Sequence, residues 1–110
     1  MTDLSGYRAM WLLAMFDLPV ETPELKRRYA IFRKALLKDG FMMLQYSVYG
    51  RFCESEDAAE VHRKRVRRWV PEEGEVRVFA LTDRQFAKME VFRGKRRVPA
   101  EEVPPLLQLM

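Results

Sequence analysis

The hydrophobic positions along the chain follow two different spacings, one typical of buried strands and one typical of amphipathic helices. Residues 10–16 are continuously apolar, which predicts a strand that is buried on both faces. The next segment, which extends to about Lys38, is predicted to be a helix with one apolar face. The apolar residues of that face, spaced by four, three and four, are Leu25, Tyr29, Phe32 and Leu36.

Capping residues predict the ends of two helices. Thr22 can cap the first helix, Pro23 suits its first turn, and Gly40 predicts its end. Ser55 can cap a second helix, which ends near residues 69–71. The apolar segments that flank these two helices are therefore the candidates for strands.

Three later segments have the composition of strands. Residues 41–53 are rich in aromatic and branched side chains, and they fit either two short strands around Gln45 or one kinked strand. Residues 75–81 alternate between apolar and polar positions, and residues 86–92 are interpreted as an additional strand. The order strand, helix, strand pair, helix, strand predicts an α+β sandwich with a ferredoxin-like βαββαβ fold. Both helices would cover the same face of the sheet.

The length and composition fit a single domain. A chain of 110 residues of which 48% are hydrophobic can bury a modest core, so a second domain is not expected. We expect one ferredoxin-like domain over residues 1–110, with its core in residues 8–82 and a C-terminal strand and tail in residues 83–110. A second copy would cover the sheet face that carries no helix, which predicts a homodimer.

The C-terminal tail has two alternative interpretations. It contains the basic stretch 94–97 and several prolines, and it ends with the apolar residues 106–107 and 109–110. Such an ending fits an arm that docks on a partner protein. A frayed terminus fits equally well.

Basic residues concentrate on the two predicted helices, in a chain whose net charge is +4. In the first helix they are Lys26, Arg27, Arg28, Arg33 and Lys34. In the second helix they are Arg63, Lys64, Arg65, Arg67 and Arg68. Two basic helices on one face of a sheet predict a platform for the phosphate backbone of a nucleic acid. The alternative is that both helix faces are simply solvated, with acidic neighbours that dilute their charge.

Several kinds of site are disfavoured by the residue types that the chain contains. Cys53 is the only cysteine, which excludes an internal disulfide and a cysteine-based metal cluster. His62 is the only histidine, and its apolar neighbours on the helix favour packing over catalysis. The chain has no glycine-rich phosphate loop. It also shows no signal peptide and no apolar run of membrane-spanning length, so we expect a cytoplasmic protein without membrane contact.

Asp17 is the first charged residue after the apolar run of the first strand, where that strand gives way to a helix. A carboxylate there costs free energy unless it accepts hydrogen bonds, pairs with a cation or holds a metal. Mg²⁺ commonly takes one or two carboxylates together with waters and substrate phosphates. A twofold axis near this strand end would bring two copies of Asp17 together at one metal site. The alternative is that Asp17 caps the next loop or pairs with Arg28.

Several motifs follow one another at a distinctive spacing, namely residues 10–20, Arg28–Tyr29, Phe32–Lys34, Lys38–Phe41 and Gln45–Tyr49. Their order and spacing resemble the small CRISPR-associated adaptation protein, which is also described as a CRISPR-associated endoribonuclease. The similarity spans residues 8–92. It points to the branch of this family that occurs in systems with a single large RNA-guided effector nuclease. It implies a ferredoxin-like homodimer that lies between two dimers of a larger integrase subunit and helps to insert captured foreign DNA.

The resemblance also implies roles for individual residues. Asp17 corresponds to the family's metal ligand, which faces its twin across the dimer axis, and the implied metal is Mg²⁺. Arg28 falls on a family arginine and is the second implied catalytic residue. Lys26 stands where some members have a further arginine, and Met43 stands where some nuclease-active members have a basic residue. The implied supporting positions of the active site are Phe16, Ser47 and Tyr49.

Two functions are compatible with these features. As an enzyme, paired Asp17 carboxylates would hold Mg²⁺ for phosphodiester hydrolysis, and Arg28 would offset the developing charge. As a scaffold, the chain would bridge integrase dimers and bind DNA through its basic helices, and this is the biological role that we favour, with the nuclease as an accompanying activity. Family members cut single-stranded RNA, cut duplex DNA or serve as scaffolds, so the resemblance leaves the substrate open. A stand-alone, toxin-like endoribonuclease of the same fold is the remaining alternative.

Overall fold

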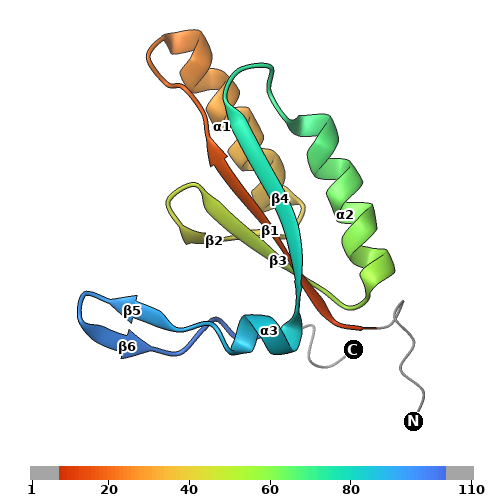
Figure 1. Ribbon diagram of the computed structural model, residues 1–110. Coiled ribbons are helices and arrows are strands. Elements are labelled where there is room, and N and C mark those ends of the chain that lie inside the picture. Colours follow the sequence, from red (N-terminus) through yellow and green to blue (C-terminus); the bar gives the residue numbers. More distant parts are fainter. Residues whose placement is uncertain (1–7, 104–110) are drawn as a thin grey trace.

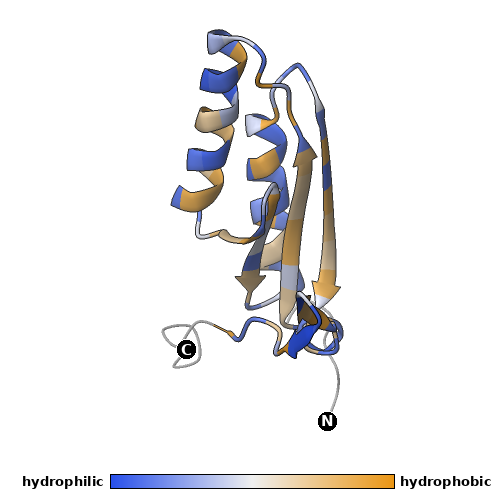
Figure 2. Ribbon diagram, turned by 90° about the vertical axis from the view of Figure 1, so that its left-hand side faces the viewer, coloured by the Kyte–Doolittle hydropathy of each residue, from blue (hydrophilic) through white to orange (hydrophobic). Residues whose placement is uncertain are grey.

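The computed structural model describes residues 8–103 and shows a four-stranded antiparallel sheet with two long helices on one face (Figure 1). In chain order these elements are β1 (Met10–Asp17), α1 (Pro23–Lys38), β2 (Met42–Gln45), β3 (Val48–Cys53), α2 (Glu56–Trp69) and β4 (Glu75–Thr82). The strands lie in the order β2-β3-β1-β4. Figure 2 shows both helices on the same side of the sheet. The ferredoxin-like fold predicted from the sequence is therefore confirmed.

β1 is a central strand that pairs with β3 on one side and with β4 on the other. Its side chains alternate between the two faces of the sheet. Leu12, Ala14 and Phe16 belong to the core beneath the helices. Trp11 and Leu13 belong to a second cluster on the opposite face. The strand is continuously apolar because both of its faces are covered.

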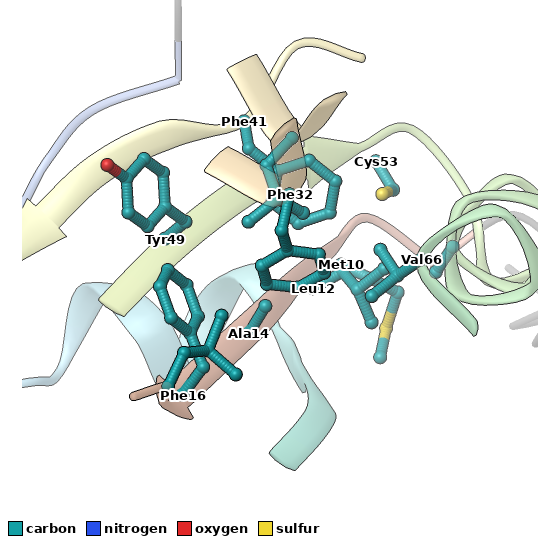
Figure 3. Close-up of a cluster of buried hydrophobic side chains, with 12 residues drawn as sticks. Met10, Leu12, Ala14, Phe16, Phe32, Phe41, Tyr49, Cys53 and Val66 are labelled. Atoms are coloured by element: carbon teal, nitrogen blue, oxygen red, sulfur yellow. The ribbon is translucent and has the colours of Figure 1, made fainter. Parts of the chain in front are cut away.

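The main core lies between the sheet and the two helices (Figure 3). Phe32 and Leu36 of α1 and Val66 of α2 are at most 1% exposed, and they pack against side chains of β1 and β3. The apolar face predicted for the first helix is confirmed at these two α1 positions. Leu25 and Tyr29, nearer the start of α1, are only partly buried.

The predicted helix caps are present. The Thr22 hydroxyl oxygen accepts a hydrogen bond from the Leu25 amide at 3.1 Å. The Ser55 hydroxyl oxygen accepts one from the Ala58 amide at 3.0 Å. Gly40 follows α1 with a φ of 98°, a left-handed conformation that favours glycine and ends the helix.

The segment for which the sequence offered two alternatives forms two strands rather than one kinked strand. β2 and β3 form a hairpin in which Gln45 lies opposite Val48, so only Tyr46 and Ser47 form the turn. Ser47 has a φ of 62°, a left-handed conformation that residues other than glycine rarely adopt. The backbone of this turn is therefore tightly constrained.

The strand predicted over residues 86–92 is wrong for its first half. A short helix, α3 (Asp83–Ala87), precedes the strand, and only β5 (Val91–Arg93) is extended. The helix begins there because Thr82 and Gln85 form a reciprocal capping box, each side chain accepting a hydrogen bond from the other's backbone amide. The apolar residues of this segment are compatible with a strand, but the capping signal before them determines the conformation.

α3 packs on the sheet face that carries no long helix. Phe86 stacks on Trp11 with ring centroids 4.1 Å apart, and the Trp11 indole nitrogen donates to Asp83 Oδ1 at 3.0 Å. The helix covers only part of this face. Partly buried hydrophobic side chains surround the contact at Met42, Leu44, Phe52, Phe79 and Leu81.

The C-terminal part of the described chain forms a second, separate sheet. β5 and β6 (Arg96–Val98) pair as a hairpin that projects away from the main sheet (Figure 1). Gly94 lies in its turn with a φ of 66°. The additional C-terminal strand expected from the sequence is therefore present, but it joins this hairpin and not the four-stranded sheet. The apolar end of the predicted docking arm lies outside the described residues.

Candidate active site and nucleic-acid interface

Asp17 ends β1 with an exposed side chain, directly opposite Glu75 of β4. It borders a depression of about 550 Å³ at this end of the sheet. Its lining comes from the end of β1 and the loop that follows it, from α1, from the β2–β3 turn and from the loop before β4. The lining includes Asp17, Glu21, Tyr29, Tyr46, Ser47 and Gly74. The carboxylate that the sequence singled out is therefore accessible to a ligand.

Backbone contacts position the strand end that carries Asp17. The Phe16 amide donates to the Ser47 carbonyl oxygen at 3.0 Å, which joins β1 to the β2–β3 turn. Gly74 has a φ of 88°, and a Cβ atom there would lie only 2.7 Å from the Asp17 carbonyl oxygen. The loop before β4 therefore needs glycine at this position to approach Asp17 so closely.

Two of the predicted supporting residues lie in the core behind Asp17. Phe16 and Tyr49 are buried, and their rings stack with centroids 5.6 Å apart. Arg33 of α1 donates from Nε to the Tyr49 hydroxyl oxygen at 2.7 Å. The two rings pack in the core next to the strand end that carries Asp17. The third predicted supporting residue, Ser47, borders the depression itself.

Arg28 pairs with two glutamates. Its Nη1 donates to both carboxylate oxygens of Glu73 at 2.6 Å, and its Nε donates to Glu24 Oε1 at 3.3 Å. The hydrogen bond from Arg28 lowers the pKa of Glu73, and the same bond raises the pKa of Arg28. Within residues 8–103 Arg28 forms no ion pair with Asp17, so the alternative in which these two residues pair is not observed. Arg28 instead ties α1 to the loop before β4.

Sequence reasoning missed Glu73 as the partner of Arg28. The two residues are 45 positions apart, so no helical or strand spacing relates them. Arg28 lines a small hollow with Glu73, and that hollow shares Leu18, Pro19 and Tyr29 with the larger depression beside Asp17. The structure therefore places Arg28 next to the depression but not in its lining.

Glu73→Gln is expected to lower the melting temperature at neutral pH and to have no such effect in acid. The folded-state pKa of Glu73 is below its ordinary value, so its charge stabilises the fold above the ordinary glutamate pKa. That contribution is lost as the pH falls through the lowered folded-state pKa. The effect should be small, because the Arg28 and Glu73 side chains are 40% and 41% exposed.

The measurement is the melting temperature of wild type and Glu73→Gln from about pH 7 down to about pH 3. Glu72→Gln, a change at the exposed neighbouring residue, is the matched control. A difference between wild type and Glu73→Gln that stays constant across this range would contradict the expected linkage.

His62 is a packing residue, as its neighbours on the helix predict. It is buried, and its Nδ1 lies 2.6 Å from Asp39 Oδ2. Asp39 Oδ1 accepts a hydrogen bond from Arg65 Nη1 at 2.7 Å, and the Asp39 carbonyl oxygen accepts one from Arg51 Nε at 2.7 Å. Asp39 therefore joins the end of α1 to α2 and β3. Sequence reasoning did not identify this residue.

The residues around the depression fit a hard cation only as part of a larger site. Asp17 and Glu21 contribute carboxylates and Ser47 contributes a hydroxyl group, and Mg²⁺ prefers such oxygen ligands. Among residues 8–103 no cluster of three or more His, Cys, Asp or Glu side chains could hold a metal ion. A single chain therefore offers one or two carboxylates, the number that Mg²⁺ commonly takes when waters and substrate oxygens complete its shell.

The predicted basic platform is divided between paired and available charges. Arg63 pairs with Glu60, Arg65 with Asp39, and Arg27 with Glu24. Within the described part of the chain, no ion pair engages several exposed basic residues of the same helices. These are Lys26, Lys34, Lys64, Arg67 and Arg68. The surface available to a polyanion is therefore smaller than the number of basic residues in the sequence suggests.

A hollow of about 440 Å³ lies between the two basic helices. Lys38, Asp39 and Arg65 line it together with Trp69, whose side chain is half-buried. Because Asp39 engages Arg65, the Lys38 ammonium group and the Trp69 ring are the features of this hollow that fit contact with a phosphate backbone. This hollow lies on the helical face, whereas Asp17 lies at one end of the sheet.

Known proteins of one family match nearly the whole chain. Residues 10–89 match the family described as CRISPR associated protein Cas2. The chain is 54% identical over 100 residues to the CRISPR-associated endoribonuclease Cas2 of Parvibaculum lavamentivorans, and the match covers 91% of this chain and 99% of that protein. It is 47% identical over 108 residues to the CRISPR-associated endoribonuclease Cas2 of Flavobacterium psychrophilum, covering 98% and 94%.

A solved structure supports the fold independently. A crystal structure of cas2 aligns with a TM-score of 0.53 and 24% sequence identity, and it covers 87% of this chain and 99% of that chain. At this level of sequence identity, the similarity shows only that the two folds are alike. The family match and the two more similar relatives cover most of the sequence. The chain therefore belongs to the Cas2 family of CRISPR associated proteins.

Proposed function

We propose that this chain acts in CRISPR adaptation as a homodimer that binds nucleic acid and hydrolyses phosphodiester bonds at Asp17. The observation that carries the proposal is the exposed Asp17 carboxylate at the end of a buried strand, beside a depression of about 550 Å³. The relatives from Parvibaculum lavamentivorans and Flavobacterium psychrophilum are named endoribonucleases, which supports a nuclease. Membership of the Cas2 family favours a role in adaptation over a stand-alone, toxin-like ribonuclease.

The chemistry of the site follows from the residues that line it. Asp17, with its twin from the second copy, would hold Mg²⁺, and Glu21 and Ser47 would orient groups at the edge of the depression. Bound Mg²⁺ would supply Lewis-acid chemistry at the scissile phosphate. The buried ring pair of Phe16 and Tyr49 would keep the Asp17 strand end rigid during the reaction.

Arg28 can stabilise developing negative charge with the N–H donors that its two glutamate partners leave unused. Its guanidinium group already donates to Glu73 and Glu24. Among residues 8–103 no hydrogen bond engages the donors on its Nη2 atom, so a substrate phosphate could bind there or replace one of these carboxylates. The Glu24 contact, at 3.3 Å and with an exposed carboxylate, is the weaker of the two. We propose that Arg28 keeps Glu73 and offers its remaining donors to the substrate.

The second copy of the homodimer would cover the sheet face opposite the two long helices. Hydrophobic side chains at Met42, Phe79 and Leu81 remain only partly buried there. Covering them removes apolar surface from water, which stabilises a dimer by about 25 cal/mol per Å². A twofold axis near the end of β1 would bring the two Asp17 carboxylates together. The further partners that we propose are the larger integrase subunit and captured DNA.

The nuclease proposal is tested by removing the metal. We expect the purified protein to cut labelled single-stranded RNA or duplex DNA in Mg²⁺, to stop cutting in EDTA, and to recover when Mg²⁺ is restored in excess. Binding of the same labelled strands in EDTA is measured alongside as the control. If the protein binds these nucleic acids but cuts neither of them in Mg²⁺, Asp17 is not a nuclease site.

A DNA-binding scaffold is the second candidate function, and the helical face favours it. Lys64, Arg67 and Arg68 are exposed on α2 and engage in no ion pair within residues 8–103. Exposed cations that engage in no ion pair can bind a phosphate backbone and release its counterions without first giving up a carboxylate partner. A scaffold would need these residues but not Asp17, so the two candidate functions depend on different parts of the molecule.

A further inference from the structure

We propose that Tyr46 stacks on an unpaired base and thereby selects single-stranded nucleic acid for the Asp17 site. This inference deepens the proposed nuclease function, since it concerns the form of nucleic acid that the same site accepts. Tyr46 is the first residue of the two-residue turn between β2 and β3. It is 77% exposed, the largest value among the exposed large hydrophobic residues of the described chain.

The Tyr46 ring is held in place although it is exposed. It stacks on the Tyr29 ring with centroids 6.5 Å apart and an angle of 23° between the ring planes. The neighbouring Tyr29 side chain also raises the pKa of Tyr46. One face of the ring is therefore turned toward Tyr29, and the high exposure leaves the rest of the ring to solvent.

The turn itself limits where the ring can move. Ser47, the next residue, has a φ of 62°, and its carbonyl oxygen accepts the Phe16 amide at 3.0 Å. This hydrogen bond ties the turn to the strand end that carries Asp17. A base that stacks on Tyr46 would bind a side chain that is already ordered. Binding would therefore cost little conformational entropy, which favours affinity.

Tyr46 and Asp17 border the same depression of about 550 Å³. A base stacked on the tyrosine would place its neighbouring backbone phosphate over that depression. The ring would then supply binding and the carboxylate would supply the ligand for chemistry. Stacking on an aromatic side chain is tolerant of sequence, because every base has a π-face.

The ring discriminates between forms of nucleic acid in a way that the basic helices cannot. Lys64, Arg67 and Arg68 would contact phosphates, which both single strands and duplexes present. A duplex has its bases paired and stacked on each other, so it offers none to an external ring. Removal of the Tyr46 ring should therefore weaken the binding of single strands selectively.

The test compares affinities of the full chain in EDTA, so that no cutting is needed to measure them. The probes are a labelled single-stranded RNA, the same strand carrying abasic sites, and a labelled duplex DNA. Tyr46→Ala is expected to weaken binding of the single-stranded RNA by about tenfold and binding of the duplex by less than about twofold. Tyr46→Phe should bind like wild type, because it keeps the ring. The abasic strand should bind Tyr46→Ala and wild type equally.

Phe92→Ala is the matched control, because Phe92 is a 59% exposed aromatic residue in β5, outside the Asp17 depression. It should leave all three affinities unchanged. Equal weakening of single strand and duplex by Tyr46→Ala, or no weakening at all, would overturn the stacking inference. These affinities are measured without Mg²⁺ and without cutting, so the failure of stacking is distinguishable from the failure of the nuclease proposal.

Discussion

Asp17→Asn is expected to reduce Mg²⁺-dependent cutting by about hundredfold or more, since it removes the charged ligand on which several kcal/mol of transition-state stabilisation would depend. The change keeps the size and shape of the side chain and removes only its charge. Because Asp17 is exposed and the hydrogen bond that positions it is made by the Phe16 backbone, the fold should be unaffected. Initial cleavage rates of wild type and variant, at several Mg²⁺ concentrations, measure the effect.

Glu54→Gln is the matched control for Asp17→Asn, because it neutralises an exposed carboxylate that follows β3 outside the Asp17 depression. It should cut like wild type. The melting temperature and the size of both variants in solution should also match wild type. If Asp17→Asn cuts as fast as wild type, then Asp17 has no part in the reaction and any observed nuclease acts elsewhere.

Neutralising three cations of α2 is expected to have the second large effect. In the triple variant Lys64→Gln, Arg67→Gln and Arg68→Gln, duplex DNA affinity should fall, and its dependence on salt should become less steep. The slope of log affinity against log salt should decrease by up to about 3, one for each phosphate that the protein no longer neutralises. Glutamine keeps a good helix former at each position, so α2 should remain folded. Titrations at several salt concentrations provide the slope.

The matched control removes the same number of charges from a different surface. This control variant carries Arg93→Gln, Lys95→Gln and Arg96→Gln. All three residues are exposed and lie on or beside the β5–β6 hairpin, which projects away from the main sheet. If the α2 face is a specific platform, this control should retain most of the wild-type slope. Equal effects of both triple variants would mean that binding follows net charge rather than the helical surface.

Local patterns predicted most of the fold because the interactions behind them are local. The caps at Thr22 and Ser55 act on amides three residues away, and the apolar face of α1 follows from helical spacing. The strand prediction for residues 86–92 is partly wrong because apolar residues favour strand and helix alike when the segment is short. The capping box at Thr82 and the contact of Phe86 with Trp11 are what make residues 83–87 helical.

The candidate site was predictable only in part. Asp17 stands out in the sequence because it is the first charge after a buried run, and the structure places it at an accessible depression. Tyr46 and Glu73 were not identified, because their importance comes from contacts with Tyr29 and Arg28. The sequence spacing between these partners carries no helical or strand signal.

The sequence by itself determined the order of the main elements, the buried central strand, the position of Asp17 and the basic character of both helices. Each of these depends on residue type and on spacing within one segment. The tertiary structure alone decided that Asp39 engages Arg65, that Arg28 pairs with Glu73, and that Tyr46 borders the same depression as Asp17. These relations arise where separate segments meet at a sheet end or a helix face, and packing of the whole chain sets them.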